Sequence, residues 1–502
     1  MPWLALHLPL LSLEAFAATL TQAERATPLA LVAQHRIGAV NAAAAARGVR
    51  PGLKRATALA LAADLRLGQA DPARDAAALQ AVAHAALAFT PLVAPDGNAT
   101  VLLGVQSVLR YHGGPERLRA RLLAALAPLG HRLQLASAPT PLGAALLARW
   151  GTAEHGDLAW GRHSTDPAAL QALLDAAPVW LLGPGREHWE ALQGMGLQVL
   201  ADLRALPRAG LTRRFGATLL ADLDRARGDA PDPREPVVAP PVFESRLELF
   251  ARADTTEQVL YGAGVLLARL LAWAQARQSR IAAFTLRMQH EPRRRGHEDG
   301  APDHTDLLVE LAEPAADAAQ LNVLLRERLA NCPLPAPTLE LRLHCQRLVK
   351  APAPSGELFP TRQSQHEGLA RLLERLRARL GDAQVQRLQP VADHRPEHAS
   401  RLQGAPSLAV AAPAMAPTLP LHRPAWLLPA PQPLAERATL PLLDGRPLQI
   451  VSGPERIEAG WWDGDLAARD YFIARADDGA LVWIYRTRLA APDGWFLQGR
   501  FG

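Results

Sequence analysis

The chain has 502 residues, of which 49% are hydrophobic, enough for roughly three or four domains with sizeable cores. Its net charge of +5 is compatible with a polyanionic partner but does not require one. The two cysteines, Cys332 and Cys345, exclude a disulfide framework, and their spacing lacks the paired short intervals of a zinc site.

The first twenty residues, MPWLALHLPLLSLEAFAATL, have the apolar character of a secretory signal. However, no basic residue precedes the apolar run and Glu14 interrupts it, so a buried first strand is the preferred interpretation. No later stretch has the uninterrupted apolar length of a membrane span. We therefore expect a cytoplasmic protein with no membrane partner.

Residues 1–165 have the pattern of an α/β domain. A strand in PWLALHL is followed by alanine-rich helices, and two short strands surround the turn in TPLALVAQHRIGAVN. The turn Pro95-Asp96-Gly97-Asn98 leads into an apolar strand, ATVLLGV. An amphipathic helix follows, and HRLQLASAPTPLGAALLARW adds a strand, a loop and a helix.

Residues 166–236 are predicted to be helical with short glycine-centred turns. The sequence LLGPG at 181–185 has the apolar-Gly-x-Gly character of a helix-hairpin-helix turn, which presents backbone N–H groups to a phosphate oxygen. An ordinary loop is the alternative interpretation. The candidate DNA contacts of this region are Gly183, Gly185, Arg186, Arg213 and Arg214.

Residues 237–350 predict the order βαββαβ, a four-stranded sheet with two helices on one side. Alternation in FESRLELF, RIAAFTLRMQ and TLELRLHCQ places apolar side chains on the helix-covered face. Arg246, Arg287 and Arg342 fall on the opposite, open face. A basic open face suits nucleic acid, and a solvated polar face is an equally weighted alternative.

Residues 351–440 predict a polar, Pro-rich linker, a helix in HEGLARLLERLRARLG and a poorly ordered Pro/Ala-rich stretch. Residues 441–502 alternate in aromatic strands with Asp-Gly turns, which predicts a small β unit. So short a unit buries little by itself, and we expect its aromatic residues to include a partner-binding surface. The candidates are Trp461, Trp462, Tyr471, Trp483, Tyr485 and Trp495.

The succession of regions up to about residue 350 resembles a Y-family translesion DNA polymerase. In that resemblance 1–165 correspond to palm and fingers, 166–236 to a helix-hairpin-helix thumb and 237–350 to the little finger. With the aromatic tail, GPERIEAGWWDG…RDYFIAR…LVWIYR…WFLQGRFG, the whole chain is similar to the ImuB branch of that family. The branch consists of catalytically defective polymerase relatives that act in bacterial damage-induced (SOS) mutagenesis.

Active Y-family members need an Asp on the first palm strand and an Asp-Glu pair on a later strand, which hold two magnesium ions. Here His7, Leu8 and Pro9 stand at the first place, and Ala99 and Thr100 stand at the second. Neither set offers the charged oxygens that magnesium binds. The resemblance therefore implies no catalytic residue, no metal and no cofactor in this chain.

The nucleotide grip of the family is missing as well. Its Tyr and Arg correspond to Ala42 and Ala45, and its Asn-Lys pair corresponds to Thr140-Pro141.

Three nearby side chains are considered as substitute metal ligands, and a structural role is the preferred interpretation for each. Asp96 belongs to a turn in which Asp is favoured for local backbone bonding, Glu14 is expected at a helix start, and His7 is expected as a core residue.

The apolar pair Leu358-Phe359 resembles the end of a sliding-clamp-binding peptide, Gln-x-x-Leu-Phe. Ser355 stands where the Gln is expected, which weakens the polar anchor. The alternative is a contact that packs the linker back on the preceding domain.

The resemblance implies a non-catalytic adaptor in translesion synthesis. Its partners would be DNA, the sliding clamp, an error-prone replicative-type DNA polymerase and a RecA-like accessory protein that docks on the tail. Two alternatives remain open: an active Y-family polymerase with unusual metal ligands, and a DNA-free protein scaffold on the same fold.

Overall fold

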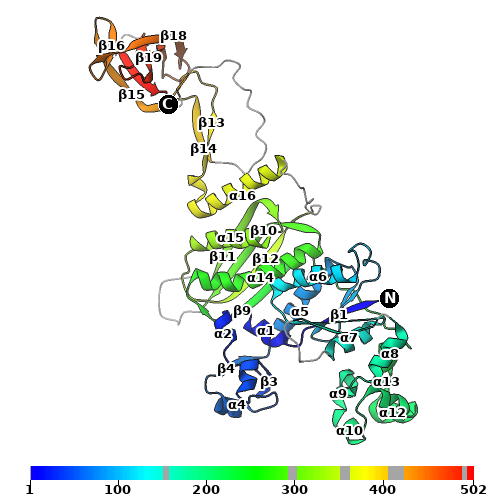
Figure 1. Ribbon diagram of the computed structural model, residues 1–502. Helices are drawn as coiled ribbons and strands as arrows, with labels where there is room; N and C mark the ends of the chain where they lie inside the picture. Colours follow the sequence, from blue (N-terminus) through cyan, green and yellow to red (C-terminus); the bar gives the residue numbers. More distant parts are fainter. Residues whose placement is uncertain are drawn as a thin grey trace. The chain divides into compact units, whose positions relative to one another are not determined.

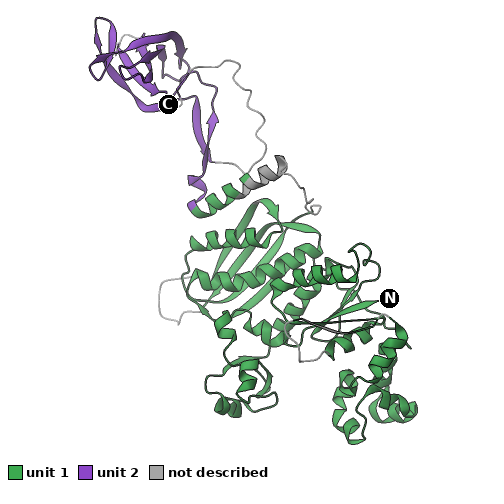
Figure 2. Cartoon of the chain, viewed as in Figure 1, with its two compact units in different colours: residues 1–379 green, residues 380–502 purple. Residues whose placement is uncertain are grey.

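The structure is a computed structural model, and it describes residues 2–150, 158–164, 166–291, 302–350, 362–404, 423–424, 426–488 and 494–501. The chain divides into two compact units (Figure 2). Unit 1 comprises residues 1–379 and unit 2 comprises residues 380–502.

The first part of unit 1 is built on a five-stranded sheet in the order β5-β6-β1-β7-β8 (Figure 1). Neighbouring strands are antiparallel, except that β7 and β8 are parallel. The central strand β1 is almost entirely buried, as expected for a strand covered on both faces. The strands are β1 (Trp3–His7), β5 (Val93–Pro95), β6 (Thr100–Gly104), β7 (Leu133–Ala138) and β8 (Leu158–His163).

Helices cover both faces of this sheet. Successive side chains of a strand point to opposite sides, so those of β1 enter two different cores. Leu4 and Leu6 share a core with α5 and α6, whereas Trp3 and Ala5 share a core with α7. The helices of this part are α1 (Leu11–Ala17), α2 (Gln22–Arg25), α5 (Pro72–Leu87), α6 (Pro115–Leu126) and α7 (Pro141–Arg149).

A smaller three-stranded sheet, in the order β3-β2-β4, has its own core against two short helices. Its elements are β2 (Leu29–Ala33), β3 (Arg36–Val40), α3 (Ala42–Ala46), α4 (Arg55–Leu61) and β4 (Arg66–Gln69).

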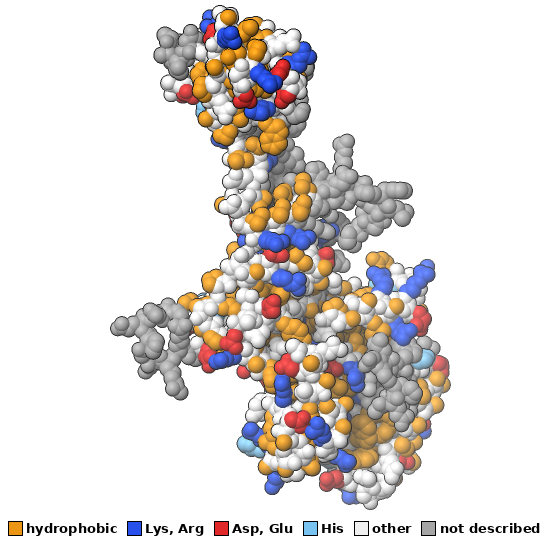
Figure 3. All heavy atoms as spheres, turned by 60° about the vertical axis from the view of Figure 1, so that its left-hand side comes forward, with side chains coloured by type: hydrophobic (Ala, Val, Ile, Leu, Met, Phe, Trp, Pro, Cys, Tyr) orange, Lys and Arg blue, Asp and Glu red, His pale blue; other side chains and the backbone are white. Residues whose placement is uncertain are grey.

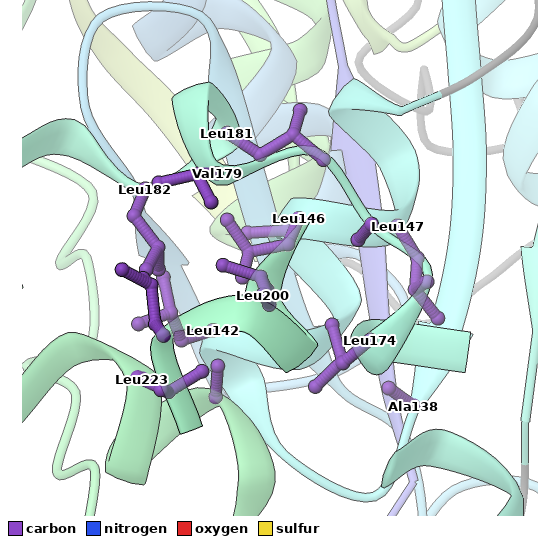
Figure 4. Packing of buried hydrophobic residues seen from close by; sticks show 14 of the residues in the cluster. Ala138, Leu142, Leu146, Leu147, Leu174, Val179, Leu181, Leu182, Leu200 and Leu223 are labelled. Atoms are coloured by element: carbon purple, nitrogen blue, oxygen red, sulfur yellow. The ribbon is translucent and has the colours of Figure 1, made fainter. Parts of the chain in front are cut away.

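The region after β8 is helical, as the sequence predicted. Its leucines pack on α7, so that Leu146 lies in one cluster with Leu174, Leu200 and Leu223 (Figure 4). This cluster joins the helical region to the first sheet. The helices are α8 (Pro167–Asp175), α9 (Gly183–Glu187), α10 (Trp189–Gly194), α11 (Leu200–Ala205), α12 (Arg208–Phe215) and α13 (Ala217–Arg227).

The last large part of unit 1 runs β9-α14-β10-β11-α15-β12, and its sheet has the order β11-β10-β12-β9. The inward side chains of the strands form one core with α14 and α15, which leaves the other sheet face open. The elements are β9 (Phe243–Ala253), α14 (Thr256–Ala276), β10 (Ser279–His290), β11 (His304–Ala315), α15 (Ala318–Ala330) and β12 (Thr338–Lys350).

Helix α14 corrects one expectation about membranes. By length and composition alone it could cross a bilayer, although the sequence predicted no such segment. In the structure it packs on the four-stranded sheet, and Val259, Leu266, Leu270 and Trp273 are fully buried there. The helix therefore serves as the core helix of this part of unit 1.

Helix α16 (Arg362–Leu380) is the helix predicted to end at Gly381. It contacts α15 through polar groups: Gln320 donates to Glu374 at 3.3 Å, and Asn331 donates to the carbonyl oxygen of Ala378 at 2.8 Å. Leucines expected on its apolar side, Leu369 and Leu372, are exposed.

Unit 2 contains a seven-stranded sheet in the order β17-β16-β15-β21-β20-β19-β18, and a hairpin of β13 and β14. Strand β15 pairs with β21, so the folded unit reaches into the segment that the sequence predicted as linker up to residue 440. The strands are β13 (Gln386–Pro390), β14 (Ser400–Gly404), β15 (Trp426–Arg437), β16 (Leu440–Leu443), β17 (Arg446–Pro447), β18 (Gln449–Ala459), β19 (Ala467–Arg475), β20 (Leu481–Thr487) and β21 (Trp495–Arg500).

Candidate functional site

The two strand positions at which the resemblance to active Y-family polymerases leads us to look for metal-binding carboxylates lie side by side. His7 at the end of β1 is directly opposite Thr100 at the start of β6. The Nδ1 atom of His7 lies 3.1 Å from the carbonyl oxygen of Ala99 and 3.0 Å from the hydroxyl oxygen of Thr100. The imidazole of His7 thus lies within hydrogen-bond distance of a backbone carbonyl oxygen and of a buried hydroxyl, and none of these three residues carries a carboxylate.

His7 carries no charge at neutral pH. Burial is the main cause that lowers its pKa to about 4, and the positive charges of Arg149 and Arg186 lower it further. Within the described ranges, no group of three or more His, Cys, Asp or Glu side chains is placed to hold a metal ion.

The carboxylate of Asp96, one of the alternative ligands, accepts hydrogen bonds from two arginines. One of its carboxylate oxygens accepts from Arg149 at the end of α7, and the other accepts from Arg234 at 2.5 Å. Arg234 also pairs with Asp232 at 2.8 Å, and Asp232 accepts from the backbone N–H of Leu142 in the first turn of α7. This group of four charged side chains, the Asp96 cluster, ties the turn before β6 to α7 and to the segment after α13.

Glu14, the other carboxylate considered, also has protein partners. It accepts from the backbone N–H of Arg132 at 3.0 Å and lies 3.5 Å from the ring of His131. Neither alternative carboxylate is therefore available as it stands to replace the missing ligands.

The positions of the nucleotide grip offer no cationic side chain. Ala42 and Ala45 are exposed on α3, and their side chains end at Cβ. The hydroxyl of Thr140 caps α7 at the N–H of Gly143 and donates to the carbonyl oxygen of Ala226 at 2.6 Å, which joins α7 to α13.

The predicted helix-hairpin-helix turn falls at the start of α9. Gly185 is buried, and a Cβ there would lie 2.2 Å from the carbonyl oxygen of Val179, so close packing explains this glycine. Gly183 is exposed. Arg186 is exposed and its guanidinium lies 5.6 Å from the ring centroid of Trp180.

Arg213 and Arg214 lie in the last turn of α12 and are exposed. Among the described residues neither forms an ion pair, and Arg214 lies over the ring of Phe215 at 5.6 Å. Their positive charges are therefore not neutralised by a described carboxylate.

The three arginines of the four-stranded sheet form one row across neighbouring strands. Arg287 is opposite Arg342, which in turn is opposite Arg246. Each has a carboxylate partner: Arg246 and Arg342 share Glu340, both at 2.6 Å, and Arg287 pairs with Asp306 at 2.7 Å.

The open sheet face is therefore mixed in charge rather than basic, which corrects the expectation drawn from the arginines alone. Two further carboxylates lie on this face of β9. Glu248 is opposite Glu340, and Glu244 is opposite His344. Basic and acidic side chains are likewise mixed on the face of unit 1 shown in Figure 3.

Most of the aromatic residues assigned to a partner surface are buried in unit 2, which corrects that assignment. Tyr471, Trp483 and Tyr485 belong to one core and Trp495 to another, and each side chain is at most 5% exposed. They stabilise the β unit and are not accessible to a partner in the folded chain.

Trp461 and Trp462 are the accessible members of that set, 78% and 55% exposed. Their rings meet edge to face with centroids 5.5 Å apart, and the guanidinium of Arg395 lies 5.6 Å from the Trp462 ring. The buried Arg395 binds Asp393, Asp463 and Asp465, and its hydrogen bonds lower the pKa of Asp393 to about 2. The tryptophan pair is thus held by a charged network from the β13–β14 connection.

The clamp-peptide residues Leu358 and Phe359, and Ser355 before them, lie outside the described residues.

Sequence reasoning missed the Asp96 cluster and the Arg395 network. Arg149 and Arg234 are 53 and 138 positions from Asp96, and Arg395 is 68 positions from Asp463. Partners so far apart along the chain are not connected by any local sequence pattern.

The mixed α/β architecture is the class that the sequence predicted. No protein-family model matches the chain. An insertion ternary complex of Dbh DNA polymerase is similar over 70% of this chain and 99% of that chain, with 14% identity and a TM-score of 0.39. DinB from Sulfolobus solfataricus is similar over 69% of this chain and 98% of that chain, with 15% identity and a TM-score of 0.38.

Two curated relatives are similar in sequence over most of the chain. Protein ImuB of Caulobacter vibrioides, from strains NA1000 / CB15N and ATCC 19089 / CIP 103742 / CB 15, is 30% identical over 480 residues. The match covers 91% of this chain and all of the relative. The chain therefore belongs to the ImuB family, and the resemblance stated from its sequence is confirmed.

Proposed function

We propose that this protein is a non-catalytic, DNA-binding adaptor of translesion DNA synthesis. The observation that carries the proposal is the pairing of His7 with Ala99 and Thr100, where an active relative needs three carboxylates. The neutral imidazole and the occupied Asp96 support the same conclusion, because phosphoryl transfer to a primer end depends on charge-stabilising metal ions.

In this proposal each candidate binding region of the chain has its own partner. The helical region and, to a lesser extent, the arginine row of the open sheet face bind the DNA backbone. Leu358-Phe359 binds the sliding clamp, and the exposed Trp461-Trp462 pair binds a RecA-like accessory protein. An error-prone replicative-type polymerase supplies catalysis in this proposal.

The purified protein should add no nucleotide to a primed template with either magnesium or manganese. The missing carboxylates and the missing grip at Ala42 and Ala45 leave no means of holding metal-bound triphosphate. Primer extension on a gel measures this directly. Template-directed extension that is abolished by a substitution at Thr100 would instead favour the active-polymerase alternative.

DNA binding should depend on salt more than on sequence, because arginines without a base-reading arrangement contact phosphates. The double variant R213A/R214A should flatten the slope of log K against log salt by about 0.9 for each phosphate that the variant no longer neutralises. The triple variant R246A/R287A/R342A should have a smaller effect, because each of these arginines already has a carboxylate partner.

Fluorescence anisotropy with a labelled primer-template at several salt concentrations measures both slopes. R47A is the control, since Arg47 is exposed and paired with Asp64 on the small sheet region. An unchanged slope in R213A/R214A would remove the helical region as a contact, and no DNA binding at all would favour the protein-scaffold alternative.

Replacing Leu358 and Phe359 by alanine should abolish clamp binding and leave DNA binding intact. Burial of each side chain contributes roughly 1.5–3 kcal/mol before the cost of ordering the linker. S355Q should tighten binding by restoring the polar anchor. Surface plasmon resonance on immobilised clamp tests this, with L372A as the control because Leu372 is an exposed leucine of α16. Full clamp binding by the double variant would exclude the linker as the docking site.

A further inference from the structure

Unit 1 contains a cavity of about 380 Å³ that is separate from the strand positions of the missing carboxylates. It lies between α5 and β9, the edge strand of the four-stranded sheet, and α14 contributes to its wall. Its polar lining includes His84 of α5, Ser245 of β9 and Arg269 of α14. The further charged side chains of the lining are Asp71, Arg74, Glu244, Arg246 and Glu248. α5 and α14 pack directly against each other, so the walls come from contacting elements.

Arg269 is a buried cation with no counter-ion among the described residues. Its side chain is 5% exposed, and it donates to the hydroxyl of Ser245 at 3.2 Å and the carbonyl oxygen of Arg246 at 3.4 Å. Within the described part of the chain no carboxylate lies within 4 Å of its guanidinium. Burial lowers its pKa to about 10, so it still carries its charge at neutral pH. A buried, unpaired charge is strongly unfavourable unless something else completes its environment.

His84 contributes a second unsatisfied group to the same cavity. It is 4% exposed, and its Nε2 atom has no hydrogen-bond partner among the described residues. Burial lowers its pKa to about 4, so the ring is neutral and can offer one N–H without adding charge. A buried polar atom of this kind requires a hydrogen-bond partner, which the described residues do not supply.

The rest of the lining limits what can enter. Ala77, Val242 and Phe243 provide apolar surface, whereas Glu244 and Glu248 place negative charge along the same wall. Arg74 and Arg246 add positive charge to the lining, so the charges are mixed and form no broad basic surface for a nucleic acid. The apolar surface favours a ligand with a hydrophobic body.

We propose that this cavity binds a small molecule through one oxyanion group, a carboxylate or a phosphate. Arg269 and the Nε2–H of His84 hold the oxyanion, and the body of the ligand lies against the apolar wall. Charge-assisted hydrogen bonds from a guanidinium are the strongest that a side chain can offer to such a group. The site is independent of the proposed adaptor function.

The test compares the full chain and R269M in thermal unfolding with sodium phosphate, sodium benzoate, or sodium chloride at the same ionic strength. At about ten times its Kd, phosphate or benzoate should raise the Tm of the wild type by about 2 °C or more over chloride. R269M should lose this gain, and its Tm in chloride should equal or exceed that of the wild type, because an unpaired buried charge is gone. R117M, which removes an exposed arginine of α6, should keep the gain.

The two anions distinguish the group that is recognised, since phosphate tests the oxyanion alone and benzoate tests a carboxylate on an apolar ring. If R269M does not fold, H84Q replaces it, and calorimetry should show at least a threefold weaker affinity for the effective anion. The proposal is overturned if neither anion exceeds chloride, or if the variant responds as the wild type does. It is also overturned if R269M folds but has a clearly lower Tm in chloride, because Arg269 would then be a structural residue.

Discussion

Replacing Trp483 by alanine should unfold unit 2 of the full chain. The Trp483 ring is 2% exposed, stacks on Tyr471 with centroids 4.2 Å apart, and lies under the guanidinium of Arg423 at 5.8 Å. Large-to-small substitution of a buried aromatic side chain costs about 3–5 kcal/mol, which is a large part of the stability of a small β unit. Hydrogen exchange of residues 380–502 in increasing urea would measure the loss.

The matched substitution W461A should leave the stability of unit 2 within about 0.5 kcal/mol of the wild type, since Trp461 is 78% exposed. In a binding assay with the RecA-like accessory protein, W461A/W462A should weaken binding by roughly 30-fold, because aromatic anchors carry a disproportionate share of interface energy. Equal destabilisation by W461A and W483A would contradict the division between core and surface. Unchanged partner binding by W461A/W462A would remove this pair as the docking site.

Replacing Asp96 by alanine should destabilise unit 1 by about 3–5 kcal/mol. The side chains of Asp96, Arg149 and Arg234 are 11%, 21% and 15% exposed, so the substitution leaves two largely buried arginines without this partner. The urea midpoint of the full chain, followed by circular dichroism and by hydrogen exchange of α7, would report the change.

The surface ion pair of Arg47 and Asp64 gives the control for this effect. Both side chains are more than half exposed, so D64A should cost less than about 0.5 kcal/mol. Adding R149M to D96A should recover part of the loss, because Arg234 keeps Asp232 as its partner and no buried charge of the cluster is then left unpaired. If D96A and D64A have the same small effect, the Asp96 cluster does not hold α7 and the segment after α13 together.

The regular elements of unit 1 were predictable because their signals are local. Alternation with a period of two placed Leu247, Phe284 and Leu343 inside the four-stranded sheet, and all three are buried there. The absence of carboxylates at His7, Ala99 and Thr100 could also be read directly, because a missing functional group requires no coordinates. The membership of the ImuB family followed from similar short motifs.

What the sequence did not determine depends on contacts between distant positions. The same alternation that predicted aromatic strands in the tail could not say which aromatic side chains would face a core, and four of the six proposed surface residues proved to be buried. The arginine row was predicted residue by residue, but the pairing of Glu340 with Arg246 and of Asp306 with Arg287 depends on the register of neighbouring strands.

The sequence by itself therefore determined the α/β class, the strands of the open-faced sheet and the residue types at positions 7, 99 and 100. The tertiary structure alone decided that Asp96 is bound by two arginines and that Trp461 and Trp462 are accessible. It also decided that Arg269 is buried with no carboxylate partner among the described residues. The physical reason is the sequence separation of the interacting groups. Periodicity can be recognised within a few residues, whereas burial and charge pairing depend on packing between elements far apart in the chain.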